Sequence, residues 1–195
     1  MKEVAMSSKN FNITVNVEEL MTEFIPKLAK EYIQMRGTQE ELKGTELKLT
    51  LDISGDVYSY TIKDGVDFEI KQGNIDHSMV HIALSLESMA HLADMQNIDM
   101  LIGMQKQLTR KKFDLLSALK GCSVFQIKKS DGSVSEITVI FNGTLTPKTT
   151  LRLSMQDANL ISSGKESPIN LFMSGKMKIE GDITFAMKLQ PLFTA

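Results

Sequence analysis

The stretch that decides the fold is Ser167-Pro-Ile-Asn-Leu-Phe-Met-Ser-Gly-Lys-Met-Lys-Ile-Glu-Gly-Asp-Ile-Thr-Phe-Ala-Met-Lys-Leu189. Its pattern predicts an apolar helix, a Gly-Lys turn, a short strand, a Gly turn and a second apolar helix. Gly175 and Gly181 permit the two tight reversals, because glycine has no Cβ. Met177 and Ile179 are two residues apart, so they face the same side of the short strand. Two apolar helices and an apolar strand face, brought together in this way, can form the wall of a cavity.

Composition excludes several classes of protein. Hydrophobic residues make up 42% of the 195-residue chain, charged residues 24%, and the net charge is -2. This balance is that of an ordinary globular protein, and it lacks the basic excess of a nucleic-acid-binding protein. No apolar run reaches the roughly 20 residues of a membrane span, and the first ten residues lack the apolar core of a signal peptide. Because the single Cys122 also fits a reducing compartment, we expect a cytoplasmic protein.

Methionine is unusually frequent, with 13 Met and no Trp. Its side chain is unbranched and polarizable, so it lines surfaces that must fit variable apolar partners. Methionine also fills gaps in ordinary cores. Composition alone therefore leaves two interpretations open, a binding surface and an ordinary core.

The first half of the chain predicts a helix followed by a sheet. Asn16 caps the expected helix, and Pro26 within it predicts a kink or a break. Three alternating segments follow, and the Asp/Gly turns between them predict an antiparallel meander. These segments cover residues 46–54, 57–62 and 66–70. A further strand at 79–86 leads into helical stretches that start near residues 87, 98 and 112.

The same order of elements begins again after residue 120. His81-Ile-Ala-Leu-Ser-Leu-Glu-Ser88 matches Thr150-Leu-Arg-Leu-Ser-Met-Gln-Asp157, and Ile98-Asp-Met-Leu-Ile-Gly103 matches Ile169-Asn-Leu-Phe-Met-Ser174. This agreement predicts an internal duplication, and chance similarity among short apolar runs is the alternative. The predicted organisation is an N-terminal segment and helix at 1–40, a first unit at 41–120 and a second unit at 121–195, packed as one body.

Two parts of the second unit carry a fairly specific pattern. They are Leu151-Arg-Leu-Ser-Met-Gln-Asp-Ala158 and Gly175-Lys-Met-Lys-Ile-Glu-Gly-Asp182 with the Ala-Met-Lys-Leu that follows it. On these residues the unit resembles the sterol carrier protein (lipid-transfer) family. The first unit matches only in outline, since Met104-Gln105 and Arg110-Lys111 stand in place of the two glycine turns. The resemblance implies an α+β fold in which a mixed or antiparallel sheet is covered by helices around an apolar tunnel.

The resemblance implies a non-catalytic carrier that binds and transfers a fatty acyl chain, a sterol-like molecule or a phospholipid, with no cofactor and no metal. A tail of a dozen methylenes would gain on the order of 10 kcal/mol on burial, before the cost of association. The basic run Lys106–Lys112 is either a solvated face or a transient contact with anionic lipid headgroups. The residues expected to line or close the cavity are Leu171, Phe172, Met173, Met177, Ile179, Phe185 and Met187 in the second unit, and Met89, Leu92, Met95, Met100, Leu101 and Met104 in the first.

Motifs of catalysis are absent from the sequence. His77, His81 and His91 do not have the spacing of a metal site such as His-Glu-x-x-His. Lys120 near Cys122 could lower the pKa of the thiol, although a buried inert thiol explains this cysteine better. No nucleophile elbow, Walker loop or dinucleotide fingerprint occurs. We therefore expect no enzyme, and the alternative to a carrier is a structural or dimerisation module whose apolar faces pack without a lipid cavity.

Overall fold

A computed structural model describes residues 3–8, 11–37, 39–92 and 108–193. Its centre is a mixed sheet of eight strands in the order β10-β9-β7-β8-β6-β3-β4-β5. These strands are β3 (Glu46–Ile53), β4 (Asp56–Lys63), β5 (Asp67–Gln72), β6 (Val80–Leu84), β7 (Gly121–Lys128), β8 (Val134–Phe141), β9 (Lys148–Ser154) and β10 (Lys178–Gly181). The expectation of an α+β fold with a mixed sheet is confirmed.

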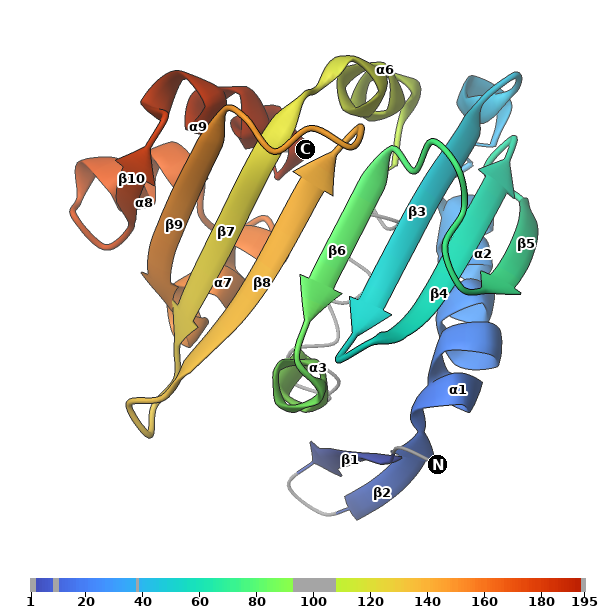
Figure 1. Cartoon of the computed structure of the whole chain (residues 1–195), viewed down its shortest axis with the longest axis horizontal. Helices are drawn as coiled ribbons and strands as arrows, with labels where there is room; N and C mark the ends of the chain where they lie inside the picture. Colours follow the sequence, from blue (N-terminus) through green and yellow to red (C-terminus); the bar gives the residue numbers. More distant parts are fainter. Residues whose placement is uncertain (1–2, 9–10, 38, 93–107, 194–195) are drawn as a thin grey trace.

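Helices lie along one face and at the ends of this sheet (Figure 1). They are α1 (Val17–Glu19), α2 (Ile25–Arg36), α3 (Leu86–Leu92), α6 (Arg110–Ala118), α7 (Met155–Ser162), α8 (Pro168–Met173) and α9 (Ile183–Leu189), with short 3-10 turns η2 (Glu40–Leu42) and η3 (Gln190–Leu192). A separate hairpin of β1 (Glu3–Ser8) and β2 (Phe11–Asn16) precedes them. In the view of Figure 1, α2 and α7 lie behind the sheet.

Strands pair in the same way in the two halves of the chain. β3 and β4 form an antiparallel hairpin, and β6 lies parallel to β3. Likewise β7 and β8 form an antiparallel hairpin, and β9 lies parallel to β7. The two sets join where β6 pairs antiparallel with β8, with Ile82 opposite Val139. One sheet, and therefore one continuous apolar face, runs through both halves.

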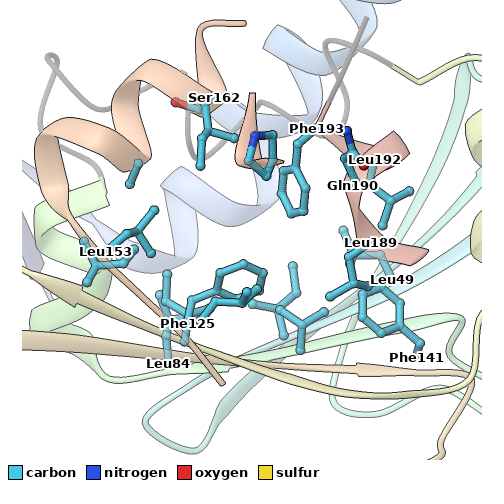
Figure 2. A pocket seen from close by; sticks show the side chains of 18 of the residues that line it. Leu49, Leu84, Phe125, Phe141, Leu153, Ser162, Leu189, Gln190, Leu192 and Phe193 are labelled. Atoms are coloured by element: carbon cyan, nitrogen blue, oxygen red, sulfur yellow. The ribbon is translucent and has the colours of Figure 1, made fainter. Parts of the chain in front are cut away.

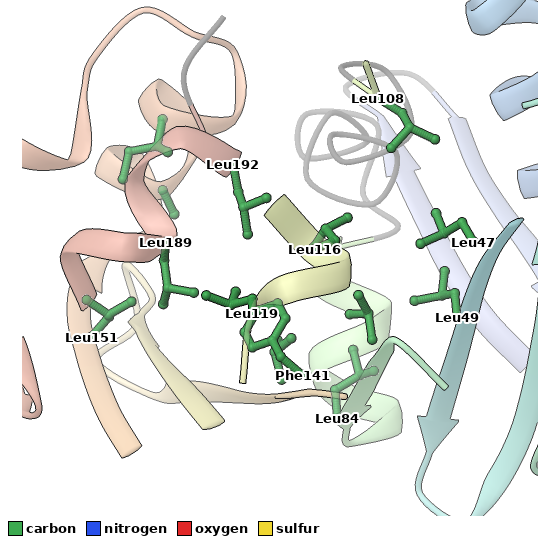
Figure 3. Packing of buried hydrophobic residues seen from close by; sticks show 14 of the residues in the cluster. Leu47, Leu49, Leu84, Leu108, Leu116, Leu119, Phe141, Leu151, Leu189 and Leu192 are labelled. Carbon is green, nitrogen blue, oxygen red and sulfur yellow. The ribbon is translucent and has the colours of Figure 1, made fainter. Parts of the chain in front are cut away.

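The apolar face is covered by side chains from the helices and from the segments that flank them. Figure 3 shows Leu84, Phe141 and Leu151 on the sheet, with Leu116, Leu119, Leu189 and Leu192 packed above them. Asn142, just after β8, holds the end of α6 in place. Its Nδ2 donates hydrogen bonds to the carbonyl oxygens of Leu116 and Leu119, at 2.8 and 2.7 Å. These bonds satisfy carbonyls that a helix end leaves without partners inside the helix.

The N-terminal helix changes its hydrogen-bonding pattern next to Pro26, where the sequence predicted a kink or a break, but its helical backbone is continuous. Leu20–Phe24 form a π-helical turn, η1, and α2 then begins with Pro26 in its first turn. Proline is tolerated there because the amide hydrogens of a first turn have no partner within the helix. The Tyr60 hydroxyl donates a buried hydrogen bond of 2.8 Å to the Met21 carbonyl oxygen. This bond ties η1 to β4.

Replacing Tyr60 with Phe is expected to lower the free energy of unfolding by about 1–3 kcal/mol, because the buried Met21 carbonyl oxygen loses this donor. Burial raises the pKa of Tyr60, so the hydroxyl remains a donor through neutral and mildly alkaline pH. Urea unfolding of Tyr60→Phe measures the loss. Tyr58→Phe is the matched control, since it removes a hydroxyl from the same strand without breaking the bond to Met21. Equal losses in the two variants would contradict the role of this bond.

Candidate functional site

An apolar pocket of about 250 Å³ lies between the sheet and the helices. Each of the eight strands contributes to its lining, from Phe68 on β5 to Ile179 on β10. The helices α2, α7, α8 and α9 contribute the opposite side, together with η3. Figure 2 shows Leu84 and Phe125 on the sheet side, across from Ser162 and Phe193. Both halves of the chain thus line one pocket.

The pocket offers hydrocarbon almost exclusively. Among the described residues that line it, none is charged, and the polar ones are Tyr60, Ser162 and Gln190. The Tyr60 hydroxyl is bonded to the Met21 carbonyl oxygen, and Ser162 Oγ donates to the Asn159 carbonyl oxygen at 3.2 Å. Two of the three polar groups are therefore already satisfied by the protein. Such a lining favours apolar molecules and gives no counter-charge to an ionised group.

Short caps and glycine turns place the C-terminal helices over the sheet. Ser154 Oγ accepts a hydrogen bond from the Asp157 amide at the start of α7, and Ser167 Oγ accepts one from the Asn170 amide at the start of α8. Helix α8 ends at Met173, and two residues later Gly175 has a φ of +74°, in the left-handed region that favours glycine. After β10, Asp182 caps α9. The chain therefore reverses its direction twice within 20 residues. The glycines permit the turns, and the polar capping residues start the helices that follow.

Four of the residues expected from the sequence line this pocket. Met177 lies in the turn before β10, Ile179 in β10 and Met187 in α9, and Met89 comes from α3 in the first half. Met177 and Met89 are buried, whereas Ile179 and Met187 are half-buried. The structure thus brings residues of both predicted sets to one place.

Other expected residues lie beside the pocket or away from it. Leu171 and Phe185 are buried in the core, and the Phe185 ring packs edge-on against Phe141 at 6.2 Å between centroids. Phe172 is half-buried, and Met173 is 78% exposed. Helix geometry explains this difference, because residues two positions apart point to nearly opposite sides of a helix. With Leu171 directed into the core, Met173 projects outward.

The remaining expected residues cannot be placed. The backbone of Leu92 belongs to α3, but its side chain is outside the described residues. Met95, Met100, Leu101 and Met104 also lie outside them. Their part in the pocket stays a prediction.

Most of the lining comes from residues that we did not single out in the sequence. On the sheet they include Phe125, Ile127, Leu151 and Leu153, and from α2 they include Ile25, Pro26 and Ala29. The strand residues follow a period of two, which is the signal of one buried strand face. That signal was present in the sequence. The contribution of α2 has no comparable local signal, because it depends on packing between distant segments.

Groups that could support chemistry are not gathered in the described residues. Within that part of the chain, no three His, Cys, Asp or Glu side chains are close enough to hold a metal ion. None of the described helices is long and apolar enough to cross a membrane. Burial raises the pKa of the Cys122 thiol, and the opposing effect of Lys148 is smaller. The interpretation of Cys122 as a buried thiol agrees with this environment.

Cys122 is expected to react with a disulfide reagent such as Ellman's reagent at least about tenfold more slowly in the folded protein than in urea. The thiolate is the reactive form, and burial both covers the sulfur and raises its pKa. The folded-state rate should keep rising as the pH passes the ordinary pKa of a free thiol, about 8.5. A folded-state rate equal to the rate in urea would contradict the buried position.

The sequence of the second half matches a known family. Residues 105–194 match the model of the SCP-2 sterol transfer family. This match confirms the resemblance read from residues 151–158 and 175–189, and it extends further toward the N-terminus to include α6. It covers 90 of the 195 residues, so it concerns the second half of the chain. No curated protein sequence matches the chain.

Several solved structures are similar to parts of the chain. Sterol carrier protein 2-like 2 from Aedes aegypti is 22% identical over 37% of this chain and 73% of that one, with a TM-score of 0.32. Sterol carrier protein domain 2 of Helicoverpa armigera is 27% identical over 47% and 76%, with a TM-score of 0.36. Sterol carrier protein 2 from Yarrowia lipolytica is 14% identical over 91% and 93%, with a TM-score of 0.24. Because all three TM-scores are below 0.5, the fold described above rests on the strand pairing of this chain.

Proposed function

We propose that this protein binds a hydrophobic ligand, such as a fatty acyl chain, a sterol-like molecule or a phospholipid, and transfers it without catalysis. The observation that carries the proposal is the uncharged pocket over the sheet. The match of residues 105–194 to a sterol transfer family supports the same function. Four residues expected from the sequence to meet a ligand line this pocket, which supports the assignment of the site.

The physical chemistry of such a site explains carriage without specific polar contacts. Each buried methylene contributes roughly 0.8 kcal/mol, so a single tail supplies enough free energy to offset the cost of association. Because this energy depends on area and not on direction, moderate selectivity among lipids is expected. A carrier of this kind releases its ligand to a membrane or a partner without breaking any strong directional bond.

Two further parts of the proposal concern the origin and the location of the protein. We propose that the halves arose by duplication, and the support is the recurrence of a hairpin followed by a strand parallel to its first member. In both halves a serine at the end of this parallel strand, Ser85 just after β6 and Ser154 as the last residue of β9, accepts a hydrogen bond from the amide three residues later. We also propose a cytoplasmic location, which cell fractionation tests.

The decisive experiment is native mass spectrometry of the purified protein, with organic extraction of any molecule that accompanies it. A discrete adduct that disappears on denaturation, with a lipid in the extract, is the expected result. A clean mass that stays unchanged after incubation with fatty acids and cholesterol would contradict the carrier function. A concentration-dependent oligomer under those conditions would then favour the structural or dimerisation module.

A further inference from the structure

The lining of the pocket comes closest to solvent at the start of α8. Of the described residues that line the pocket, Ile169 is the most exposed, at 38%, and its neighbour Pro168 is half-buried. Ser162, at the end of α7, also lines the pocket and is half-buried. Because the described lining contains no charged residue, an ionised headgroup is more stable in water than inside. The start of α8 is therefore the place where a hydrophobic ligand can enter and keep its headgroup in water.

Helix α8 presents an apolar side to solvent next to this opening. Residues four positions apart lie on the same side of a helix, so Met173 lies beside Ile169. Met173 is 78% exposed, and Phe172, three positions after Ile169, is half-buried. Leu171 points the other way, into the core. We call the side formed by Ile169, Phe172 and Met173 the α8 face. It continues the apolar lining of the pocket to the outside of the protein.

Lysines surround the α8 face in the sequence. Lys165 precedes the helix, Lys176 and Lys178 follow it, and all three are exposed. Glu166 is the one acidic residue in the segment 160–179, and its carboxylate already accepts two hydrogen bonds from the start of α8. With three lysines and one glutamate, this segment has a net charge of +2, whereas the whole chain has a net charge of -2. An exposed apolar side with an excess of positive charge around it is complementary to an anionic lipid surface.

The basic stretch at the start of α6 is less suited to such a contact. Arg110 Nε donates a hydrogen bond of 3.1 Å to Asp114, and the Arg110 guanidinium also donates to the Lys43 carbonyl oxygen at 3.3 Å. Lys112 is buried. None of the large hydrophobic residues of α6, a helix that the structure describes in full, is exposed. Apolar exposure and positive charge therefore coincide at α8 and not at α6.

We propose that the α8 face docks on an anionic lipid surface, from which the protein takes up its ligand and to which it returns it. This proposal rests on the proposed function and names the partner of the same site. Ile169 and Met173 enter the boundary between headgroups and acyl chains, and the lysines contact the anionic headgroups. The opening beside Ile169 then faces the acyl chains, so the hydrocarbon of the ligand moves between bilayer and pocket without crossing water. A contact made by few side chains is weak and reversible, which suits repeated delivery.

Flotation of the purified protein with lipid vesicles tests the docking surface without any added ligand. Vesicles of phosphatidylcholine and phosphatidylserine should carry the protein upward in the gradient, and vesicles of phosphatidylcholine alone should carry at least about tenfold less. Higher ionic strength should weaken the binding, because salt screens the lysines. Met173→Asp is expected to lower the partition onto the mixed vesicles by at least about tenfold, since a carboxylate replaces the most exposed apolar side chain of the α8 face.

Met35→Asp is the matched control. Met35 is 81% exposed and, like Met173, stands in the last turn of its helix, so the new carboxylate meets the same end of a helix dipole. Its helix, α2, lies on the opposite side of the molecule from α8 in Figure 1. The control should float as the unmodified protein does, and equal losses in the two variants would overturn the assignment to the α8 face. Circular dichroism checks both folds, and Met173→Gln replaces Met173→Asp if that variant unfolds.

The lysines are tested separately from the apolar side chains. Replacing both Lys165 and Lys176 with Gln should weaken binding to the mixed vesicles by about 25-fold, about fivefold for each lysine. Binding to phosphatidylcholine alone should not change. A double variant that binds the mixed vesicles as tightly as the unmodified protein would contradict the electrostatic part of the proposal.

The outcomes distinguish the docking surface from the carrier function. If the unmodified protein binds a fatty acid in solution but floats with neither kind of vesicle, the docking surface is wrong and the carrier function stands. If it floats but binds neither fatty acids nor cholesterol, the carrier function is wrong and the docking surface stands. A dimer in solution that Met173→Asp dissociates, with no flotation, would assign the α8 face to a second copy of this chain and overturn the proposal.

Discussion

Replacing Ile179 with Asp is expected to lower the affinity for a fatty acid by about 100-fold or more. Ile179 lines the pocket from the edge strand β10, where it is half-buried. An ionised carboxylate there loses hydration against the bound hydrocarbon and gains no counter-charge from the described lining residues. A cost of about 3 kcal/mol corresponds to a loss of roughly two orders of magnitude in affinity.

Ile183→Asp is the matched control for Ile179→Asp. The affinity of both variants is measured by displacement of a fluorescent fatty acid from the protein. Ile183 is 52% exposed in the first turn of α9 and does not belong to the described lining. An acidic residue is tolerated in the first turn because it interacts favourably with the helix dipole. The control should bind as the unmodified protein does. Comparable losses in both variants would indicate that general destabilisation, and not the pocket, explains the effect.

Acid should partly restore binding in Ile179→Asp. The pocket raises the pKa of the introduced carboxyl by desolvation, so its protonated form persists to a higher pH than in a free side chain. Protonation removes the charge, and the affinity should therefore recover as the pH falls through this raised pKa. A deficit that is independent of pH would mean that lost packing dominates.

Replacing Gly181 with Ala is expected to have the largest effect on stability, a loss of about 3 kcal/mol or more in the free energy of unfolding. Gly181 has a φ of +89°, which costs an L-residue about 1–2 kcal/mol. A Cβ there would also lie 2.5 Å from the carbonyl oxygen of Lys148. That oxygen cannot move aside easily, because it accepts a hydrogen bond of 2.9 Å from the Asp182 amide.

Gly175→Ala separates backbone strain from this collision. Gly175 has a similar φ of +74°, but a Cβ there would meet no atom within 4 Å. We expect it to cost only the strain, about 1–2 kcal/mol. Urea unfolding of both variants gives the difference. If the two losses are equal, the close approach of β10 to the Lys148 carbonyl does not contribute to stability.

Local features of the fold could be predicted from the sequence, because neighbouring residues determine them. Ser154 ends a strand and caps a helix, Pro26 stands at the beginning of α2, and Gly175 and Gly181 have the left-handed backbone that their turns require. Each of these features depends on a few consecutive residues whose steric and hydrogen-bonding preferences are known. The same local pattern also anticipated the match of residues 105–194 to the model of the SCP-2 sterol transfer family.

Features that join distant segments could not be predicted. The pairing of β6 with β8 connects residues about 60 positions apart in the sequence, and no pattern within either strand specifies its partner. That pairing makes one sheet and therefore one pocket, where the sequence had suggested a cavity in each unit. The α2 residues Ile25 and Ala29 reach the pocket for the same reason. The periodicity of apolar residues in α2 predicted that one face of this helix is buried, but it did not predict which part of the sheet that face would cover.

The pairing of β6 with β8 also has a consequence during synthesis of the chain. When residues 80–84 leave the ribosome they can align with β3, but their other edge stays open until residues 134–141 follow. At roughly 5–20 residues per second, this interval lasts several seconds. An unpaired strand edge is a template for association with other chains. The nascent protein therefore passes through a stage in which this strand edge is open to association with other chains.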